Sequence, residues 1–340
     1  MFKSITGCLA LICITLTSSA QQKLFISFYN QENLFDTIDD PHKNDNEFLP
    51  DSKKQWNTER YMNKINNMSK VIASMNEGTA PDVIGMCEVE NDKVLRDVTG
   101  NAQLSKAKYR FVHFEGPDER SIDNALIFKQ SSFKLVDSKS FVVASPDFPT
   151  LKTRDILFVR LEAKNKSQIV FMVNHFPSRI GGEEASEPKR FLAAKTLRAI
   201  VDSLYKQNAS ENIVIMGDFN DEPTNKSMDS VLRAKASEYD LNNGNLFNAM
   251  YEMKQNSEGS HYYRGHFSML DQIVLSSSIT NCTGKVCFKK GSATIYKQPW
   301  MVEAEGKYKG SPLRTFVGDK YMNGFSDHLP VYLTVELKKK

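Results

Sequence analysis

One apolar run of the chain ends abruptly in an acid and an amide. The run Ile213–Met216 is typical of a strand buried on both faces, and Gly217, Asp218, Phe219 and Asn220 follow it. Asp218 and Asn220 are two residues apart, so in an extended backbone both side chains project to the same side. Such a pair can bind a metal ion, a water molecule or a phosphate group. Taken alone, an ordinary strand-to-turn junction is an equally good interpretation.

Polar residues follow other apolar runs in the same way. Asn30 and Glu32 come after Leu24–Phe28, Glu88 comes after Val83–Cys87, and His175 comes after Ile169–Val173. An acid at a strand end is usually solvated and a single histidine is more often structural, so each residue alone has a simpler interpretation. Loops at one edge of a sheet, however, are where α/β enzymes build their active sites. The recurrence of the pattern therefore favours a functional site.

The elements that would position these residues are short strands alternating with a few helices. Apolar residues at 61, 65, 68, 72 and 75 predict a helix with one buried face over Tyr61–Met75. A second helix is predicted over Lys189–Tyr205, with Ala193, Leu197, Ile200, Val201 and Leu204 facing inward. Further strands are predicted at 125–128, 156–161, 272–275 and 331–335, and residues 37–57 are expected to form a surface loop.

Six segments resemble, in the same order, motifs of the endonuclease/exonuclease/phosphatase superfamily, the DNase-I-like metal-dependent phosphoesterases. They are Tyr29–Asp36, Ile84–Glu90, Val173–Phe176, Gly217–Asp221, Leu270–Ile273 and Ser326–Pro330. Each segment is short and common, but six in one order make a chance resemblance improbable. The resemblance implies an α/β fold, a four-layered sandwich of two central mixed β-sheets flanked by helices, with the site at one end of the sheet pair.

The resemblance also implies a metal site made of carboxylates. Glu88 corresponds to the family's main Mg²⁺ ligand, with Glu32 nearby, and Asp327 would be a second metal or water ligand. Hard carboxylate oxygens suit Mg²⁺, which keeps several waters and bridges to a substrate phosphate. Mn²⁺ and Ca²⁺ are the alternative ions.

Other residues would act on the phosphate and the attacking water, again by resemblance. Asn30 and Asn220 would donate amide hydrogens to phosphate oxygens or orient the water, and Asp218 would polarise it or shuttle its proton. His328 would contact the scissile phosphate and Asp271 would orient its ring. A carboxylate on the far ring nitrogen fixes the tautomer and favours imidazolium, which stabilises the developing negative charge.

His175 resembles a second histidine found in the DNase and sphingomyelinase branches, whereas the abasic-site repair branch has a tyrosine there. Asp123 is its expected partner. Several basic residues are interpreted either as ligands of substrate phosphates or as solvated surface charge, namely Arg120, Arg179, Lys189 and Arg190.

Composition places the chain among ordinary globular proteins. It has 340 residues, of which 40% are hydrophobic and 25% are charged, and a formal net charge of +3. This near balance gives no support to a protein that coats DNA, although a locally basic groove is compatible with it. The length alone allows one large domain or two smaller ones, but the resemblance favours a single domain over residues 21–340. We expect a monomer.

Residues 1–20 predict a cleavable signal peptide. Lys3 is the only charge before Lys23, Cys8–Leu16 is apolar, and small residues precede the expected cleavage after Ala20. No later stretch approaches the roughly 20 apolar residues of a membrane span. The protein is therefore expected to be secreted or periplasmic.

Export affects the interpretation of the cysteines. Cys282 and Cys287 enclose a short loop, and in an oxidising compartment we expect a disulfide between them. Cys87 ends an apolar run and is expected to pack as a small buried hydrophobe. The cysteine spacings fit no zinc site.

The sequence thus predicts an exported, Mg²⁺-dependent phosphodiesterase, a nuclease that hydrolyses DNA or RNA by in-line attack of an activated water. A phosphatase or a sphingomyelinase-type lipid phosphodiesterase is the alternative enzyme, and a catalytically silent binding protein on the same fold is the non-enzymatic one. The sequence suggests no exposed aromatic hairpin of the kind that a lipid-surface enzyme would use.

Overall fold

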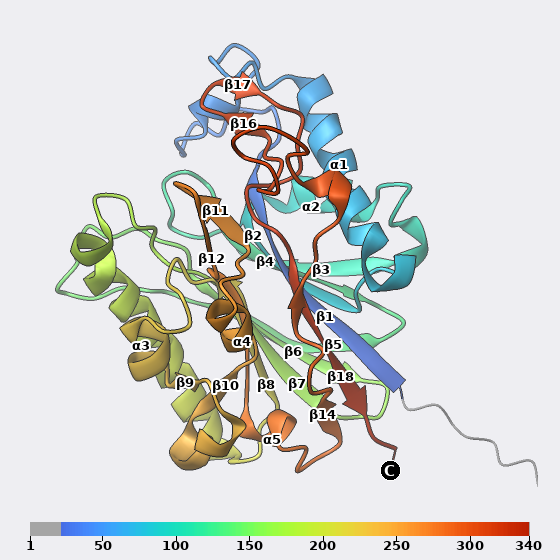
Figure 1. Cartoon of the computed structure of the whole chain (residues 1–340), viewed down its shortest axis with the longest axis vertical. Coiled ribbons are helices and arrows are strands. Elements are labelled where there is room, and N and C mark those ends of the chain that lie inside the picture. The colour runs from blue at the N-terminus through green and yellow to red at the C-terminus, as the bar shows by residue number, and fades with distance from the viewer. Residues whose placement is uncertain (1–21, 340) are drawn as a thin grey trace, which may run out of the picture.

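The structure is a computed structural model that describes residues 22–339 (Figure 1). Two seven-stranded sheets pack face to face, and helices cover their outer faces. The predicted four-layered sandwich of two mixed sheets is confirmed. The predicted signal peptide, residues 1–20, lies outside the described residues.

The first sheet places the ends of three strands at one edge. Its order is β14 (Val286–Phe288), β18 (Val331–Leu337), β1 (Gln22–Leu34), β2 (Val83–Val89), β4 (Asp123–Lys129) and β3 (Tyr109–His113), and β15 (Thr294–Ile295) also pairs with β18. Strands β1 and β2 are parallel, whereas β18 is antiparallel to β1. The carboxyl ends of β1 and β2 therefore meet the amino end of β18.

The second sheet repeats this arrangement. Its order is β5 (Phe133–Phe141), β6 (Ile156–Ala163), β7 (Gln168–His175), β8 (Ile213–Asp218), β13 (Asp271–Leu275), β10 (Leu246–Asn248) and β9 (Ala234–Lys235). Strands β7 and β8 are parallel and β13 is antiparallel to β8, so His175 and Asp271 both pair directly with Asp218. Three of the predicted site residues thus lie side by side at one edge.

Alternation along β1 explains how the layers are held together. Leu24, Ile26 and Phe28 face the core between the sheets, whereas Phe25 and Tyr29 face the helices outside. Across the inter-sheet core lie apolar residues of the second sheet, among them Phe171, Val173, Val214, Met216 and Ile273. The sheets approach closely at Gly85, where a Cβ atom would lie 2.4 Å from the sulfur of Met216.

Helices α1 (Thr58–Gly78) and α2 (Asp92–Thr99) cover the first sheet, and α3 (Glu183–Gln207) covers the second (Figure 1). The predicted apolar face of α1 is buried as expected. Helix α3 begins at Glu183 rather than at Lys189, because two acids in its first turn favour the helix start and Pro188 removes only one N–H donor. Of its predicted inward residues, Ile200 is only partly buried.

Smaller elements complete the fold. They are α4 (Tyr251–Gln255), α5 (Ser277–Thr280), a π-helical turn (Ser227–Leu232), the hairpin of β11 (His261–Tyr263) and β12 (His266–Ser268), the hairpin of β16 (Phe316–Val317) and β17 (Lys320–Tyr321), and 3₁₀ turns at Asn46–Phe48, Ser105–Ala107, Glu238–Asp240, Asn242–Gly244 and Pro299–Met301. The predicted loop 37–57 contains only the first of these 3₁₀ turns.

The structure contains the predicted disulfide and the predicted buried cysteine. Cys282 and Cys287 form a disulfide, with Cα atoms 4.5 Å apart, and Cys87 is buried with a free thiol. Among residues 22–339, no helix is both long and apolar enough to cross a bilayer.

Candidate active site

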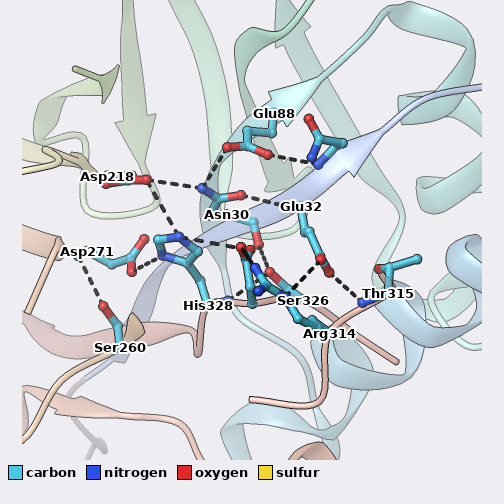
Figure 2. A network of polar contacts seen from close by, with 12 residues as sticks. Asn30, Glu32, Glu88, Asp218, Ser260, Asp271, Arg314, Thr315, Ser326 and His328 are labelled. Carbon is cyan, nitrogen blue, oxygen red and sulfur yellow. Dashed lines mark hydrogen bonds and ion pairs between the residues drawn. The ribbon is translucent and has the colours of Figure 1, made fainter. Parts of the chain in front are cut away.

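Six of the predicted site residues lie together at one end of the sheet pair, namely Asn30, Glu32, Glu88, Asp218, Asp271 and His328 (Figure 2). Asn30 and Glu32 come from the end of β1, Glu88 from β2, His175 from β7, Asp218 from the end of β8 with Asn220 just after it, and Asp271 from the start of β13, while Asp327 and His328 precede β18. All of these side chains lie at strand ends or in the short segments that adjoin them, so the double sheet determines their relative positions.

The backbone is unusual where these strands end. Glu32, Glu88 and Asn220 have φ values of 49°, 58° and 49°, in the left-handed region that non-glycine residues rarely adopt. Register irregularities also occur in the β1–β2 pairing after Asn30 and in the β2–β4 pairing at Glu88. Bulges re-aim side chains, and strained backbone of this kind concentrates at functional sites. The direction of the Glu32 and Glu88 side chains therefore cannot be deduced from simple strand alternation.

Asn30 connects the acids of the two sheets. Its amide nitrogen donates to Asp218 Oδ2 at 3.2 Å and to Glu88 Oε1 at 3.3 Å, and its oxygen accepts from the Glu32 N–H at 2.9 Å (Figure 2). Asn30 was predicted to donate to phosphate oxygens or to orient the attacking water, and that role stays a prediction. In this structure its amide hydrogens hold two carboxylates in place.

Asp218 is buried at the centre of the site. Its Oδ1 accepts from the Asn220 N–H at 2.9 Å, and its Oδ2 lies 3.8 Å from His328 Nε2 and 3.7 Å from His175 Nε2. Burial raises the pKa of Asp218 to about 7, although the nearby His328 partly opposes this effect. A carboxyl group with a pKa near neutrality suits a general base.

His328 and Asp271 form the predicted pair. Asp271 Oδ2 lies 2.6 Å from His328 Nδ1, and Asp271 is fully buried. The carboxylate accepts the Nδ1 hydrogen, so Nε2 is the ring atom that faces Asp218. Burial lowers the pKa of His328, but Asp271 and Asp218 outweigh burial and hold it well above its usual range. His328 is therefore an imidazolium at neutral pH.

The chemistry of the three predicted metal ligands fits a hard divalent cation, because all three are carboxylates with oxygen donors. Burial, together with Asp327, raises the pKa of Glu32 to about 7. Burial also acts to raise the pKa of Asp327, but the neighbouring His328 and Arg314 cations lower it to about 2. Crowded acids of this kind would be stabilised by a cation.

The structure does not gather these three acids into one cluster. Among residues 22–339, two groups of three possible metal ligands lie close together in this site. One is His261 with Asp327 and His328, and the other is Asp218 with Asp271 and His328. Glu32 accepts from the Thr315 N–H at 2.7 Å, and Glu88 accepts from the Asn33 N–H at 2.9 Å. The ligand set of Glu32, Glu88 and Asp327 therefore stays a prediction.

Three basic residues of the site were not predicted from the sequence. Lys64 is buried, and its Nζ lies 3.8 Å from Glu32 Oε2; burial lowers the pKa of Lys64 to about 8. Arg314 forms ion pairs with Glu32 (Figure 2) and with Asp327. The ring of His261 lies 4.6 Å from the ring of His328. Of the three, only Lys64 could have been found from the sequence, because it is a lysine on the mostly apolar face of α1.

The predicted roles of two arginines are not supported. Arg190 was a candidate phosphate ligand, but it is fully buried and its Nε lies 2.8 Å from Asp221 Oδ1. Arg179 donates to the Asn220 carbonyl at 2.7 Å and pairs with Asp221 at 3.2 Å. Both arginines hold the loop after β8 in place. Arg120 and Lys189 line a cavity of about 290 Å³ that also includes Ser178, which follows His175 in the chain.

The predicted pairing of Asp123 with His175 is wrong. In the described chain no hydrogen bond or ion pair joins them, and Asp123 Oδ2 lies 3.6 Å from His113 Nε2 instead. Burial and the nearby Arg154 and Arg120 lower the pKa of His175 well below its usual range, so this histidine is neutral. Its Nε2 faces the Glu88 and Asp218 carboxylates at 3.8 and 3.7 Å.

A cavity of about 480 Å³ opens beside Asp327 and Arg314. The β11–β12 hairpin contributes Tyr262, Tyr263 and Arg264 to its wall, and the loop opposite contributes Lys307 and Tyr308. Tyr263 and Tyr308 are both more than half exposed. The expectation that no aromatic hairpin exists is therefore wrong: Tyr262 and Tyr263 lie in a strand of three residues, which is too short to show a period, and Tyr308 lies in a turn.

Comparison with known proteins assigns the chain to a family. The sequence profile of the Endonuclease/Exonuclease/phosphatase family matches residues 25–337. A comparison with curated proteins found no match.

Several solved structures share the fold. A family protein from Bacteroides thetaiotaomicron has 16% identity and a TM-score of 0.55, over 94% of this chain and 99% of that one. A mannosyl-6-phosphatase from the same species has 17% identity and a TM-score of 0.55, over 93% and 99%. D. rerio TDP2 complexed with a single-strand DNA product has 16% identity and a TM-score of 0.54, over 93% and 99%. The chain belongs to the endonuclease/exonuclease/phosphatase family, whose members are metal-dependent enzymes that hydrolyse phosphate esters.

Proposed function

We propose that this protein is a Mg²⁺-dependent phosphodiesterase that hydrolyses nucleic acid. The observation that carries the proposal is the buried line of Asp271, His328 and Asp218. It sets an imidazolium beside a carboxyl group whose pKa is about 7. This combination supplies a proton acceptor for water and a positive charge for the phosphate in one place.

Asp218 acts as the base in this mechanism. It orients the attacking water and takes its proton, and the hydrogen bonds from Asn30 and from the Asn220 N–H hold the carboxylate in position. His328 presents Nε2 to the phosphate oxygens and stabilises the charge that develops on them. Bound to the carboxylates of Glu32, Glu88 and Asp327, Mg²⁺ would supply Lewis-acid stabilisation of the same charge.

The two pKa shifts are consistent with these roles. Asp218 loses its proton as the pH rises through about 7, whereas His328 keeps its proton to a pH well above the usual range for histidine. Just above neutrality the base is therefore ionised while the imidazolium is still charged. The site is prepared for hydrolysis in that pH range.

Asn220 supports the same geometry. Its side-chain nitrogen donates to the Phe176 carbonyl at 3.0 Å, which ties the loop after β8 to the residue that follows His175. We retain the proposal that its amide also contacts the substrate phosphate or the attacking water.

The cavity beside Asp327 supports nucleic acid as the substrate. Tyr262, Tyr263 and Tyr308 offer ring faces on which bases can stack, and base–aromatic stacking does not depend on sequence. Arg264 and Lys307 add positive charge for neighbouring phosphates. Among the proteins of this fold described above, one is a sugar phosphatase and one holds single-strand DNA, and the aromatic wall with its two cations favours the second kind of substrate. An exposed aromatic hairpin also fits a lipid surface, and the sphingomyelin vesicles in the panel below test that alternative.

We propose further that residues 21–340 form one exported, monomeric domain released from the signal peptide after Ala20. The disulfide between Cys282 and Cys287 supports an oxidising compartment.

A panel of substrates tests the proposal. The purified mature protein is incubated with plasmid DNA, RNA, bis-p-nitrophenyl phosphate, p-nitrophenyl phosphate and sphingomyelin vesicles, each with Mg²⁺ or with EDTA. We expect Mg²⁺-dependent cleavage of DNA or RNA and of the diester. Activity on the monoester alone would identify a phosphatase, preference for vesicles would identify a lipid phosphodiesterase, and no hydrolysis at all would identify a silent binding protein.

A further inference from the structure

Three donor groups meet at the end of the β3–β4 hairpin and share no residue with the predicted catalytic metal ligands. His113 ends β3, Asp123 begins β4, and Glu115 lies in the loop between them. In the strand register His113 pairs with Ala125, so His113 and Asp123 project from the same face of the sheet. One donor atom from each of the three lies within 4.8 Å of the others.

Asp92, at the start of α2, determines which nitrogen of His113 is free. Its Oδ1 lies 3.0 Å from His113 Nδ1, so the carboxylate accepts the hydrogen on that nitrogen. A neutral imidazole then carries its lone pair on Nε2, the atom that faces Asp123. A carboxylate on the far nitrogen is the arrangement that orients histidines which bind metals.

The atoms aimed into the cluster are buried and have no partner. His113 Nε2 and Asp123 Oδ2 have no hydrogen-bond partner among the described residues, and their side chains are 2% and 3% exposed. Their separation of 3.6 Å is too long for a direct hydrogen bond. Two atoms that each lie about 2.1 Å from one tetrahedral ion are about 3.4 Å apart. The spacing therefore fits a shared ion better than a shared proton.

The local charge also favours a cation. Three carboxylates, those of Asp92, Glu115 and Asp123, surround a single imidazole. The nearby Lys43 directs its Nζ at two backbone carbonyls of the loop, at 2.8 and 3.1 Å. Arg96 pairs with the outer oxygen of Asp92 at 3.5 Å, which leaves the buried Asp123 carboxylate with no cation beside it, among the described residues, other than a protonated His113.

We propose that His113, Glu115 and Asp123 bind a divalent transition-metal ion of the Zn²⁺ class. One imidazole and two carboxylates are ligands that Zn²⁺ accepts. Glu115 is exposed, so a water molecule completes the coordination from the solvent side. The ion pins the loop of residues 114–122 to β4. That loop carries Asp118, whose carboxylate pairs with the buried Arg154 at 3.2 Å.

Zinc binding by the metal-stripped mature protein tests this assignment. The affinity and stoichiometry for Zn²⁺ are measured by competition with a chromophoric chelator, in a Glu88→Gln background that weakens the catalytic site. We expect His113→Ala to lose one tightly bound equivalent. Asp92→Asn changes a half-exposed residue that only orients the histidine, and it should weaken binding about 10- to 100-fold with the stoichiometry retained. His266→Ala, at an exposed histidine, is the matched control and should bind as the parent does.

Circular dichroism of each variant establishes that it is folded. Equal Zn²⁺ stoichiometry and affinity in the parent and in folded His113→Ala would overturn the assignment and leave a simple imidazolium–carboxylate pair. If His113→Ala fails to fold, an unchanged affinity in Asp92→Asn overturns it equally. Neither readout depends on catalysis, so the proposed phosphodiesterase activity stands or falls separately.

Discussion

Asp271→Asn is the substitution that examines the charge of the proposed catalytic histidine most closely. Asparagine keeps the shape of the side chain but removes its charge. Asp271 Oδ2 lies 2.6 Å from His328 Nδ1 in a fully buried position, so no water can replace the lost interaction. The imidazolium is thereby destabilised, and an asparagine amide turned towards Nδ1 would also favour the wrong tautomer.

The expected loss of activity follows from the type of hydrogen bond that is removed. A hydrogen bond to a charged group contributes about 1.5–3 kcal/mol. If that contribution is needed when charge develops on the phosphate, its loss lowers kcat by about 10- to 150-fold. The KM should change little. Because Asp271 holds the pKa of His328 high, the alkaline limb of the pH–rate profile should also move to lower pH.

Initial rates on bis-p-nitrophenyl phosphate between pH 5 and 10 provide the assay. Asp229→Asn is the matched control, since Asp229 forms a partly exposed pair with Lys235 at 3.1 Å, far from the site in the fold, that should contribute little. A kcat within threefold of wild type, together with an unmoved alkaline limb, would refute the role assigned to the Asp271–His328 pair.

Three further predictions concern different parts of the structure. Because burial raises the pKa of Asp218 to about 7 and the carboxylate is the active form, kcat/KM should fall tenfold per pH unit below about 7, and a limb near pH 4 would contradict this role. Tyr263→Ala and Tyr308→Ala should each raise the KM for an oligonucleotide by about 5- to 150-fold, from the roughly 1–3 kcal/mol of one stacked base. The KM for methyl p-nitrophenyl phosphate should stay constant, and Tyr239→Ala in another cavity is the control. Gly217→Ala places a Cβ atom 2.3 Å from the Asn174 carbonyl oxygen, so it should lower the free energy of unfolding in urea by about 1–3 kcal/mol. Gly284→Ala, in open space, is the control and should be neutral. Equal urea midpoints for the two variants would contradict the packing argument.

Periodicity predicted the elements whose burial is regular. The helix α1 and the central strands β1, β2, β7 and β8 were all identifiable, because one or both of their faces meet an apolar layer. The short strands β11, β12, β16 and β17 were missed, since two or three residues carry no period. The exposed edge strand β5 was missed because its pattern is mostly polar.

The site residues also fall into those that a local sequence pattern marks and those that it does not. Residues at strand ends, such as Asp218 and His328, were predicted because short motifs mark them. Lys64 and Arg314 were not predicted, because each contacts residues that are distant in the sequence. Lys64 donates to Thr315, 251 residues away, and Arg314 pairs with Glu32 at the other end of the chain. The error over Asp123 has a related cause, because the choice between His113 and His175 as its neighbour depends on how the β3–β4 hairpin folds.

The central claim is that carboxylates binding a divalent metal act together with Asp218 on a phosphodiester. Its most direct test is the rate of DNA and bis-p-nitrophenyl phosphate hydrolysis by metal-stripped protein, before and after Mg²⁺ is added back, for wild type and Asp218→Asn. We predict that stripping lowers the wild-type rate at least ~100-fold, that Mg²⁺ restores it, and that Asp218→Asn stays at least ~100-fold slower with Mg²⁺ present. Hydrolysis that resists chelation, or a folded Asp218→Asn protein with the wild-type rate, would contradict the account.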